Sequence, residues 1–143
     1  MLLFVAGALL ALLFAFLARR FSLRRELTLF AALLLAIPVI YVLYAIVGRA
    51  SQTEVAIQSA SVLLFGGLAW LGWRRHPRAI GVGILLHALW DLGHLQAARA
   101  DRVTGFLPAG YEELCIGFDL CAGIYAIARA HDWLVALPAK ARR

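Results

Sequence analysis

The sequence predicts an all-α integral membrane protein, built as a bundle of five transmembrane helices. Of its 143 residues, 64% are hydrophobic and 15% are charged, whereas a soluble domain carries about 25% charged residues. The charges gather in short clusters between long apolar stretches. Those stretches lack the alternation of apolar and polar residues that is typical of strands.

The apolar stretches define the expected elements. We expect one transmembrane domain over residues 1–143, with helices at approximately residues 2–17, 27–47, 55–73, 79–98 and 109–128. Each stretch is about long enough to cross a hydrocarbon layer of ~30 Å. A backbone surrounded by lipid must satisfy its own hydrogen bonds, so helices are the expected structure. The chain is therefore expected to be a multi-pass protein of a bacterial inner membrane.

The basic residues predict the orientation of the bundle. If the N-terminus is outside, eleven of the fourteen lie on the inner side: Arg19, Arg20, Arg24, Arg25, Arg74, Arg75, Arg78, Arg129, Lys140, Arg142 and Arg143. Only Arg49, Arg99 and Arg102 lie outside. Lys and Arg favour the cytoplasmic side, so we expect the N-terminus outside and the C-terminus in the cytoplasm.

The same pattern accounts for the net charge of +6. Basic residues that flank apolar stretches contact anionic lipid headgroups. No polar domain remains that could bind nucleic acid, so the bilayer is the expected partner.

Ionisable residues inside the last two helices are the strongest functional signal, because such residues are costly in a membrane and mark function by default. His87, Asp91 and His94 fall within about 60° of one another around the fourth helix. The fourth and fifth helices should be antiparallel neighbours. Counting inward from their outer ends then places His87 beside Asp119, and His94 level with Glu112 and Glu113.

This combination of side chains predicts a divalent metal site. Imidazole and carboxylate groups are ligands of zinc and non-haem iron, and no Lys or Arg lies at that depth to neutralise the carboxylates. We expect His87, Asp91, His94 and Asp119 to bind the metal. Glu112 and Glu113 are candidate general bases for a water that the metal activates. A structural interhelical clamp and a cluster that holds protons instead of metal both remain open.

Further polar residues are expected around this site at the same depth: Tyr41, Tyr44, Glu54, Gln58, Tyr111 and Cys115. Tyr41, Tyr44 and Gln58 are candidates for orienting the ligands. For the two tyrosines a place in the membrane-interface belt stays open, and for Cys115 a packing role. We expect the inner half of the bundle to be nearly devoid of polar side chains.

The motifs of these two helices also resemble a known family. They read His87-x-x-Trp90-Asp91-x-x-His94, then Pro108-x-x-Tyr111, then Cys115-x-x-x-Asp119. Over residues 80–125 this pattern resembles a small family of bacterial integral membrane proteins of unknown function. The resemblance supports the site residues and implies no reaction. A looser likeness to CAAX-protease-like and alkaline-ceramidase-like membrane hydrolases does not extend to the order and spacing of the residues.

Three functions are compatible with these observations. The first is a metal-dependent enzyme, a hydrolase or an oxygen-using iron enzyme, which acts on a lipid or isoprenoid-like substrate in a pocket of the outer leaflet. The second is a proton- or metal-linked carrier, which would need a homodimer for a symmetric transporter. The third is an accessory subunit of a larger membrane complex, in which the polar cluster holds helices or a cofactor.

Overall fold

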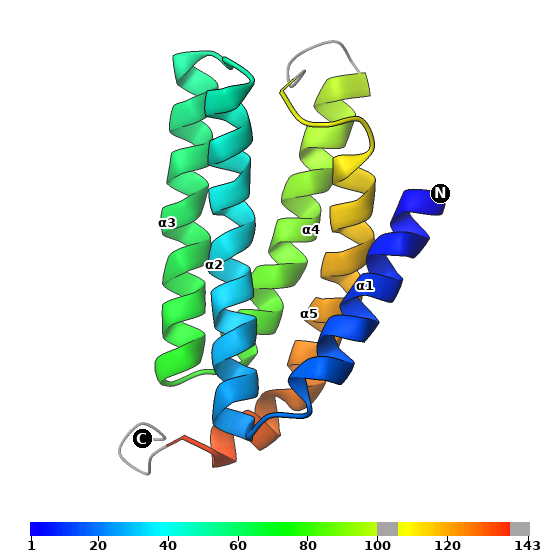
Figure 1. Cartoon of the computed structure of the whole chain (residues 1–143). Helices are drawn as coiled ribbons and strands as arrows, with labels where there is room; N and C mark the ends of the chain where they lie inside the picture. The colour runs from blue at the N-terminus through cyan, green and yellow to red at the C-terminus, as the bar shows by residue number, and fades with distance from the viewer. Residues whose placement is uncertain (100–105, 138–143) are drawn as a thin grey trace.

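A computed structural model describes residues 1–99 and 106–137 of the chain, and within these ranges all regular structure is helical. The helices are α1 (Leu2–Ala18), α2 (Leu23–Val47), α3 (Gln52–Arg74), α4 (Arg78–Arg99) and α5 (Tyr111–Val135). They run alternately down and up (Figure 1). The end that holds the α2–α3 connection is called the upper end here, and the end that holds the α1–α2 and α3–α4 connections the lower end. The expected all-α fold is confirmed.

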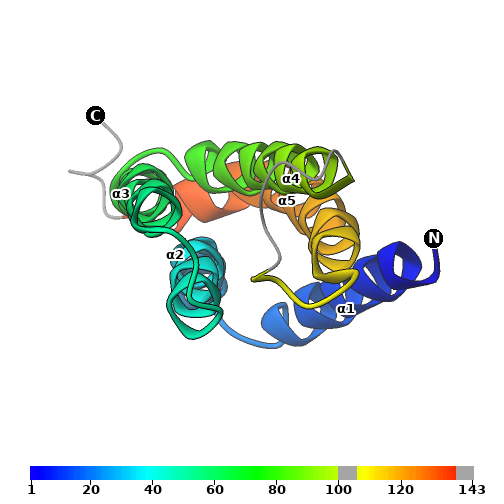
Figure 2. The same ribbon diagram turned by 90° about the horizontal axis from the view of Figure 1, so that it is seen from above.

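The five helices pack in two groups. α5 packs most closely against α4 and α1, while α2 pairs with α3, and α3 also contacts α4 (Figures 1 and 2). α2 makes few close backbone contacts with α4 and α5. Large buried side chains lie at the centre of the bundle, among them Phe30, Tyr41 and Trp133. Bulky side chains therefore separate α2 from α4 and α5.

The outside of the bundle is apolar. Large hydrophobic side chains are exposed on every helix, for example Leu12, Leu63, Leu89 and Ile124, and apolar surface of this extent is typical of proteins that face lipid. By length and composition, α2, α3 and α5 are each able to cross a membrane. α1 is apolar but, with 17 residues, is shorter than these three helices. α4 carries the ionisable residues of the predicted site. The structure thus supports a helical membrane protein.

α2 and α3 begin earlier than the sequence predicted. α3 starts at Gln52, and not near residue 55, because Ser51 and Glu54 form a capping box that satisfies the first backbone N–H groups. α2 starts at Leu23, and not near residue 27, so its first turn contains Glu26, which is fully buried.

α5 differs from its predicted bounds at both ends. It begins at Tyr111, after Gly110, whose φ of 77° lies in the left-handed region that favours glycine. It continues to Val135, and not to residue 128, because its last turns bury Trp133 completely and place Arg129 opposite Glu26. His131 is exposed and Asp132 is half exposed.

The lower half of the bundle contains a buried polar cluster, so the expectation that this half is nearly free of polar side chains was wrong. Glu26 accepts hydrogen bonds from Arg129 at 2.8 Å and from the Tyr125 hydroxyl at 2.5 Å. Arg129 also pairs with Asp132. The buried Glu26 carboxylate is tolerated because its charge is paired with that of Arg129. This ion pair links α2 to α5.

Basic residues gather at the lower end, as the predicted orientation of the bundle requires. Arg24 lies over the ring of Trp73 at 4.4 Å, and Arg74 lies near Trp70. Four of the basic residues counted in that argument lie outside the described ranges: Arg102, Lys140, Arg142 and Arg143.

Glycines allow α5 to approach both of its neighbours. A Cβ on Gly117 would lie 2.0 Å from the Phe4 carbonyl oxygen, and one on Gly7 would lie 1.9 Å from that of Leu114. At the α4 side, a Cβ on Gly81 would lie 2.9 Å from the Gly123 carbonyl oxygen. Small residues that bring backbones this close are typical of helix pairs in membranes.

We expect Gly117→Ala to destabilise the bundle, because the added methyl group meets the backbone of α1. Overpacking of this kind costs about 1–3 kcal/mol. Gly67→Ala is the matched control, since a Cβ there meets nothing within 4 Å and alanine favours a helix. The midpoints of thermal unfolding in detergent should be lower for Gly117→Ala than for Gly67→Ala; equal midpoints would contradict the close α1–α5 contact.

Candidate functional site

His87 lies between two carboxylates in the upper half of the bundle. Its Nδ1 atom is 2.9 Å from Asp119 Oδ2 and 3.4 Å from Asp91 Oδ1. Asp91 is one turn further along α4, and Asp119 comes from α5. The three side chains are at most 1% exposed. The predicted proximity of His87 and Asp119 is confirmed, and so is the pairing of α4 with α5.

Tyr41 of α2 adds a fourth member to this group. Its hydroxyl donates a hydrogen bond of 2.5 Å to Asp91 Oδ1. Its ring contacts those of His87 and Tyr111, and the ring of Phe65 covers another side of His87. Three helices thus meet in one polar group, in which hydrogen bonds join Asp119 to His87 and Tyr41 to Asp91, and an ion-pair contact joins His87 to Asp91. Aromatic rings enclose this group.

The charges of this group are not balanced by the described part of the protein. Asp91 and Asp119 form ion pairs only with His87 among the described residues. An imidazolium carries one positive charge, whereas the two carboxylates carry two negative charges. Buried charge without a partner is costly. The group therefore requires a further cation or an additional proton.

Unpartnered polar atoms point to the same requirement. His87 Nε2, Asp91 Oδ2 and Asp119 Oδ1 are all buried and have no hydrogen-bond partner. Buried polar atoms in proteins are nearly always bonded, and each exception calls for an explanation. Here every residue of the His87–Asp91–Asp119 group retains one such atom, which indicates that something outside the protein completes the group.

The spacing of the three residues is compatible with a metal ion. One donor atom from each lies within 4.8 Å of the others. Two donors that are each ~2.1 Å from a tetrahedral ion are themselves ~3.4 Å apart, and the separations from His87 Nδ1 are 2.9 and 3.4 Å. Three protein ligands that leave one position open are the arrangement of catalytic zinc sites. The group can therefore hold a metal ion.

His94 does not belong to this group, although the sequence placed it among the ligands. It lies nearer the upper end, where its Nε2 is 2.7 Å from Gln58 Nε2 and its Nδ1 is 3.0 Å from the Trp90 carbonyl oxygen. A tautomer that carries the proton on Nδ1 satisfies both contacts, because Gln58 then donates to Nε2. His94 faces α3 through its contact with Gln58.

The remaining predicted residues of α5 and α2 surround the group without joining it. Glu112 and Cys115 are buried on the same face of α5 as Asp119, and the Glu112 backbone is ~10 Å further along the helix. Glu113 contacts the amino group of Met1 at 3.5 Å. The ring of Tyr44 packs on that of Tyr111. The roles of Glu112 and Glu113 as bases therefore stay predictions.

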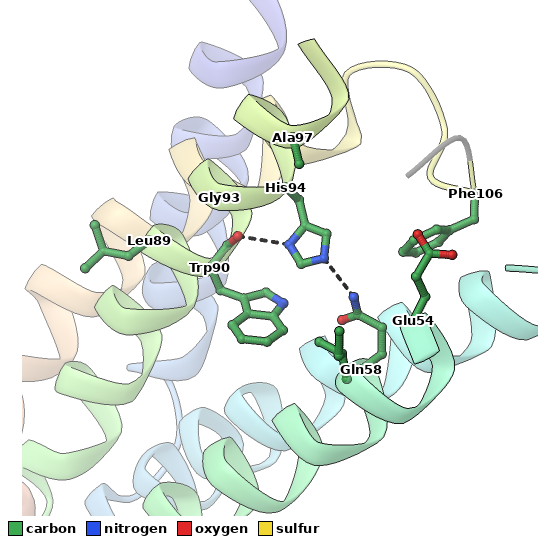
Figure 3. A pocket seen from close by; sticks show the side chains of 9 residues that line it. Glu54, Gln58, Leu89, Trp90, Gly93, His94, Ala97 and Phe106 are labelled. Carbon is green, nitrogen blue, oxygen red and sulfur yellow. Dashed lines mark hydrogen bonds between the residues drawn. The ribbon is translucent and has the colours of Figure 1, made fainter. Parts of the chain in front are cut away.

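Glu54 and Gln58 line a cavity of about 320 Å³ between α3 and α4 (Figure 3). His94 and Trp90 contribute from α4, and Phe106 closes the upper side. Phe65, Phe106 and the Trp90 indole were not among the residues predicted for the site. Aromatic residues are common throughout an apolar chain, so only the fold distinguishes the ones that enclose a site.

Comparison of the chain with protein-family models, curated proteins and solved structures found no match.

We expect Tyr41→Phe to destabilise the protein by about 1.5–3 kcal/mol, the range for a hydrogen bond to a charged group. The change removes the donor to Asp91 and keeps the ring. Tyr44→Phe makes the same change on the same helix at a half-buried tyrosine, and should have little effect. Thermal unfolding in detergent measures both, and an equal loss in the two variants would contradict this role of the Tyr41 hydroxyl.

Proposed function

We propose that the chain is a metal-dependent enzyme of the bilayer, with His87, Asp91 and Asp119 as its metal ligands. The observation that carries the proposal is the charge imbalance of this buried group, in which two carboxylates share one histidine. Zinc or iron fits an imidazole and two carboxylates. Bound there, such an ion would supply a Lewis acid for an oxygen atom of water or substrate.

The residues of the chain would orient and shield this centre. Tyr41 holds Asp91 in place through its hydroxyl, as outer partners of metal ligands do. Glu112 is the candidate proton acceptor, because it lies buried on the Asp119 face of α5 and, unlike Glu113, has no contact with the amino group of Met1. The rings of Phe65 and Tyr41 exclude bulk water from His87.

A lipid-like substrate suits the surroundings of the site. The helices around it expose apolar side chains, so a water-soluble substrate has little surface to bind. The three proposed ligands are buried. His94 lines the cavity beside α3, and its ring contacts that of Tyr41, which bonds Asp91. A substrate bound in that cavity would therefore reach the ligands when His94 moves.

The orientation of the bundle follows from its basic lower end. We propose that all five helices span the membrane, with the N-terminus outside and the lower end in the cytoplasm. Arginines that pack on Trp70 and Trp73 at this end support the assignment, because tryptophans mark a membrane interface and arginines favour its cytoplasmic side. The His87 group then lies in the outer half of the bilayer.

A reporter fused to the C-terminus tests this orientation. We expect a fluorescent protein that folds only in the cytoplasm to be active there, and alkaline phosphatase, which needs the periplasm, to be inactive. The opposite pattern would show that the bundle is inverted.

Metal analysis of the purified protein tests the metal site. Wild-type protein should contain about one zinc or iron per chain, and His87→Gln and Asp119→Asn should lose it, because each removes one of three ligands. His131→Gln is the matched control, since that histidine is exposed at the lower end. His94→Ala should keep the metal, which separates the three-ligand site from the four-ligand site that the sequence suggested.

The pH dependence gives a second readout. Metal affinity should increase as the pH rises, because the ligands must lose protons before they bind. Wild-type protein that contains no metal after incubation with zinc or iron, and whose thermal stability is unaffected by chelators, would refute the metalloenzyme.

A proton-linked carrier is the second candidate. Asp119, His87, Asp91 and Tyr41 contact one another in succession without a metal. Glu26, which is buried, and Arg129 form a second ionisable cluster in the other half of the bundle. Between them lies a layer of buried apolar side chains that includes Phe30, Leu34 and Ile84. A carrier would have to open this layer, whereas the enzyme keeps it closed.

A further inference from the structure

The cavity between α3 and α4 has walls of two kinds. Its outer part is apolar, with Ile57 and Leu89 substantially exposed on the outside of the bundle and Phe106 at the upper side. Its deep part is polar, with Gln58 and His94 held together by a contact of 2.7 Å (Figure 3). A cavity that is apolar where it meets the surroundings and polar at its base matches an amphiphile that is bound head first.

Two unpartnered polar atoms lie at the base of this cavity. Gln58 is 2% exposed, and its Oε1 atom has no hydrogen-bond partner. The Nε1 atom of Trp90 is also buried without a partner, and Figure 3 shows it on the edge of the indole that faces Gln58. One atom is an acceptor and the other a donor, so a single group that both donates and accepts would satisfy the two.

The charge around the cavity restricts that group further. Glu54 is the acidic wall residue, and its carboxylate is fixed by Ser51 in the capping box at 2.9 and 3.2 Å. Among the described residues that line the cavity, none is a lysine or an arginine. A carboxylate or phosphate head would meet a like charge at Glu54. An uncharged hydroxyl head fits both the atoms and the charge.

We propose that this cavity binds the hydroxyl head of a long-chain lipid alcohol, with the tail lying outward along Ile57 and Leu89. The alcohol O–H donates to Gln58 Oε1, and its oxygen accepts from Trp90 Nε1. That this alcohol is also the substrate of the enzyme rests on the proposed function. That the alcohol binds in this cavity does not. His94 forms the wall toward Tyr41, which holds Asp91.

Photolabelling in detergent tests the site. The probe is a long-chain primary alcohol with a diazirine in its tail, and the matching carboxylic acid is the control ligand. We expect the alcohol to label peptides of α3 and α4 more strongly than the acid does. Glu54→Gln should raise labelling by the acid, because it removes the charge while glutamine still suits the capping box.

Two glycine variants provide the matched comparison. A Cβ on Gly93, in the cavity wall, meets nothing within 4 Å, and the same holds for Gly67, which is on α3 outside the cavity. Both Gly93→Leu and Gly67→Leu should therefore fold. Gly93→Leu fills the cavity and should lower labelling about tenfold, or about 1.4 kcal/mol, while Gly67→Leu should label as wild type. Trp90→Phe should also weaken labelling, and Trp70→Phe should not.

Equal labelling of the two leucine variants, or equal labelling of the wild type by alcohol and acid, would overturn the proposal and leave the cavity with bridging water only. Metal analysis of the wild type separates the failure of the alcohol site from the failure of the metal site. If the wild type binds no metal but labelling still depends on Gly93, the metalloenzyme fails and the alcohol site stands. If metal binds as expected and Gly93→Leu is labelled as strongly as the wild type, the alcohol site alone fails.

Discussion

The close crossing of α4 and α5 fixes the geometry on which the site depends. At Gly81 and Gly123 the two backbones approach so closely that a Cβ on either residue would clash. Helices in such contact cannot slide past one another without losing it. The crossing therefore sets the antiparallel register, and one to two turns above it His87 of α4 comes to face Asp119 of α5. A shift of one residue would turn one of these side chains away from the other.

The two buried carboxylate clusters solve the same electrostatic problem differently. In the lower half, Glu26 receives a permanent cation from Arg129 and a hydroxyl from Tyr125, so its charge is met within the chain. In the upper half, Asp91 and Asp119 share one histidine and have no arginine or lysine among their described ion-pair partners. Because the fold neutralises one buried carboxylate with arginine, the lack of such a partner at the other cluster favours a site for an exchangeable cation.

The proximity of His87 and Asp119 could be predicted from the sequence, because helical rise and antiparallel packing of sequential helices place them at one level. The position of His94 could not be predicted in the same way. It shares a face of α4 with His87, but at its level the facing residue, Gln58, belongs to α3, and helix angles alone do not say which neighbour packs there. The Glu26–Arg129 pair could not be predicted either. An arginine near a helix end is typical of a topology signal, and the sequence does not indicate that its partner lies 103 positions away.

The packing of α1 has a consequence for how the chain is made. α1 packs mainly against α5, the last helix, and only slightly against α2, its successor. A ribosome releases α1 long before α5, so the face of α1 that contains Gly7 lacks its partner until α5 has been made. His87 and Asp91 likewise precede Asp119. Biogenesis must therefore hold an unfinished chain, with its ionisable residues unpaired, until α5 arrives, and a chain truncated before α5 would be a natural target for membrane quality-control proteases.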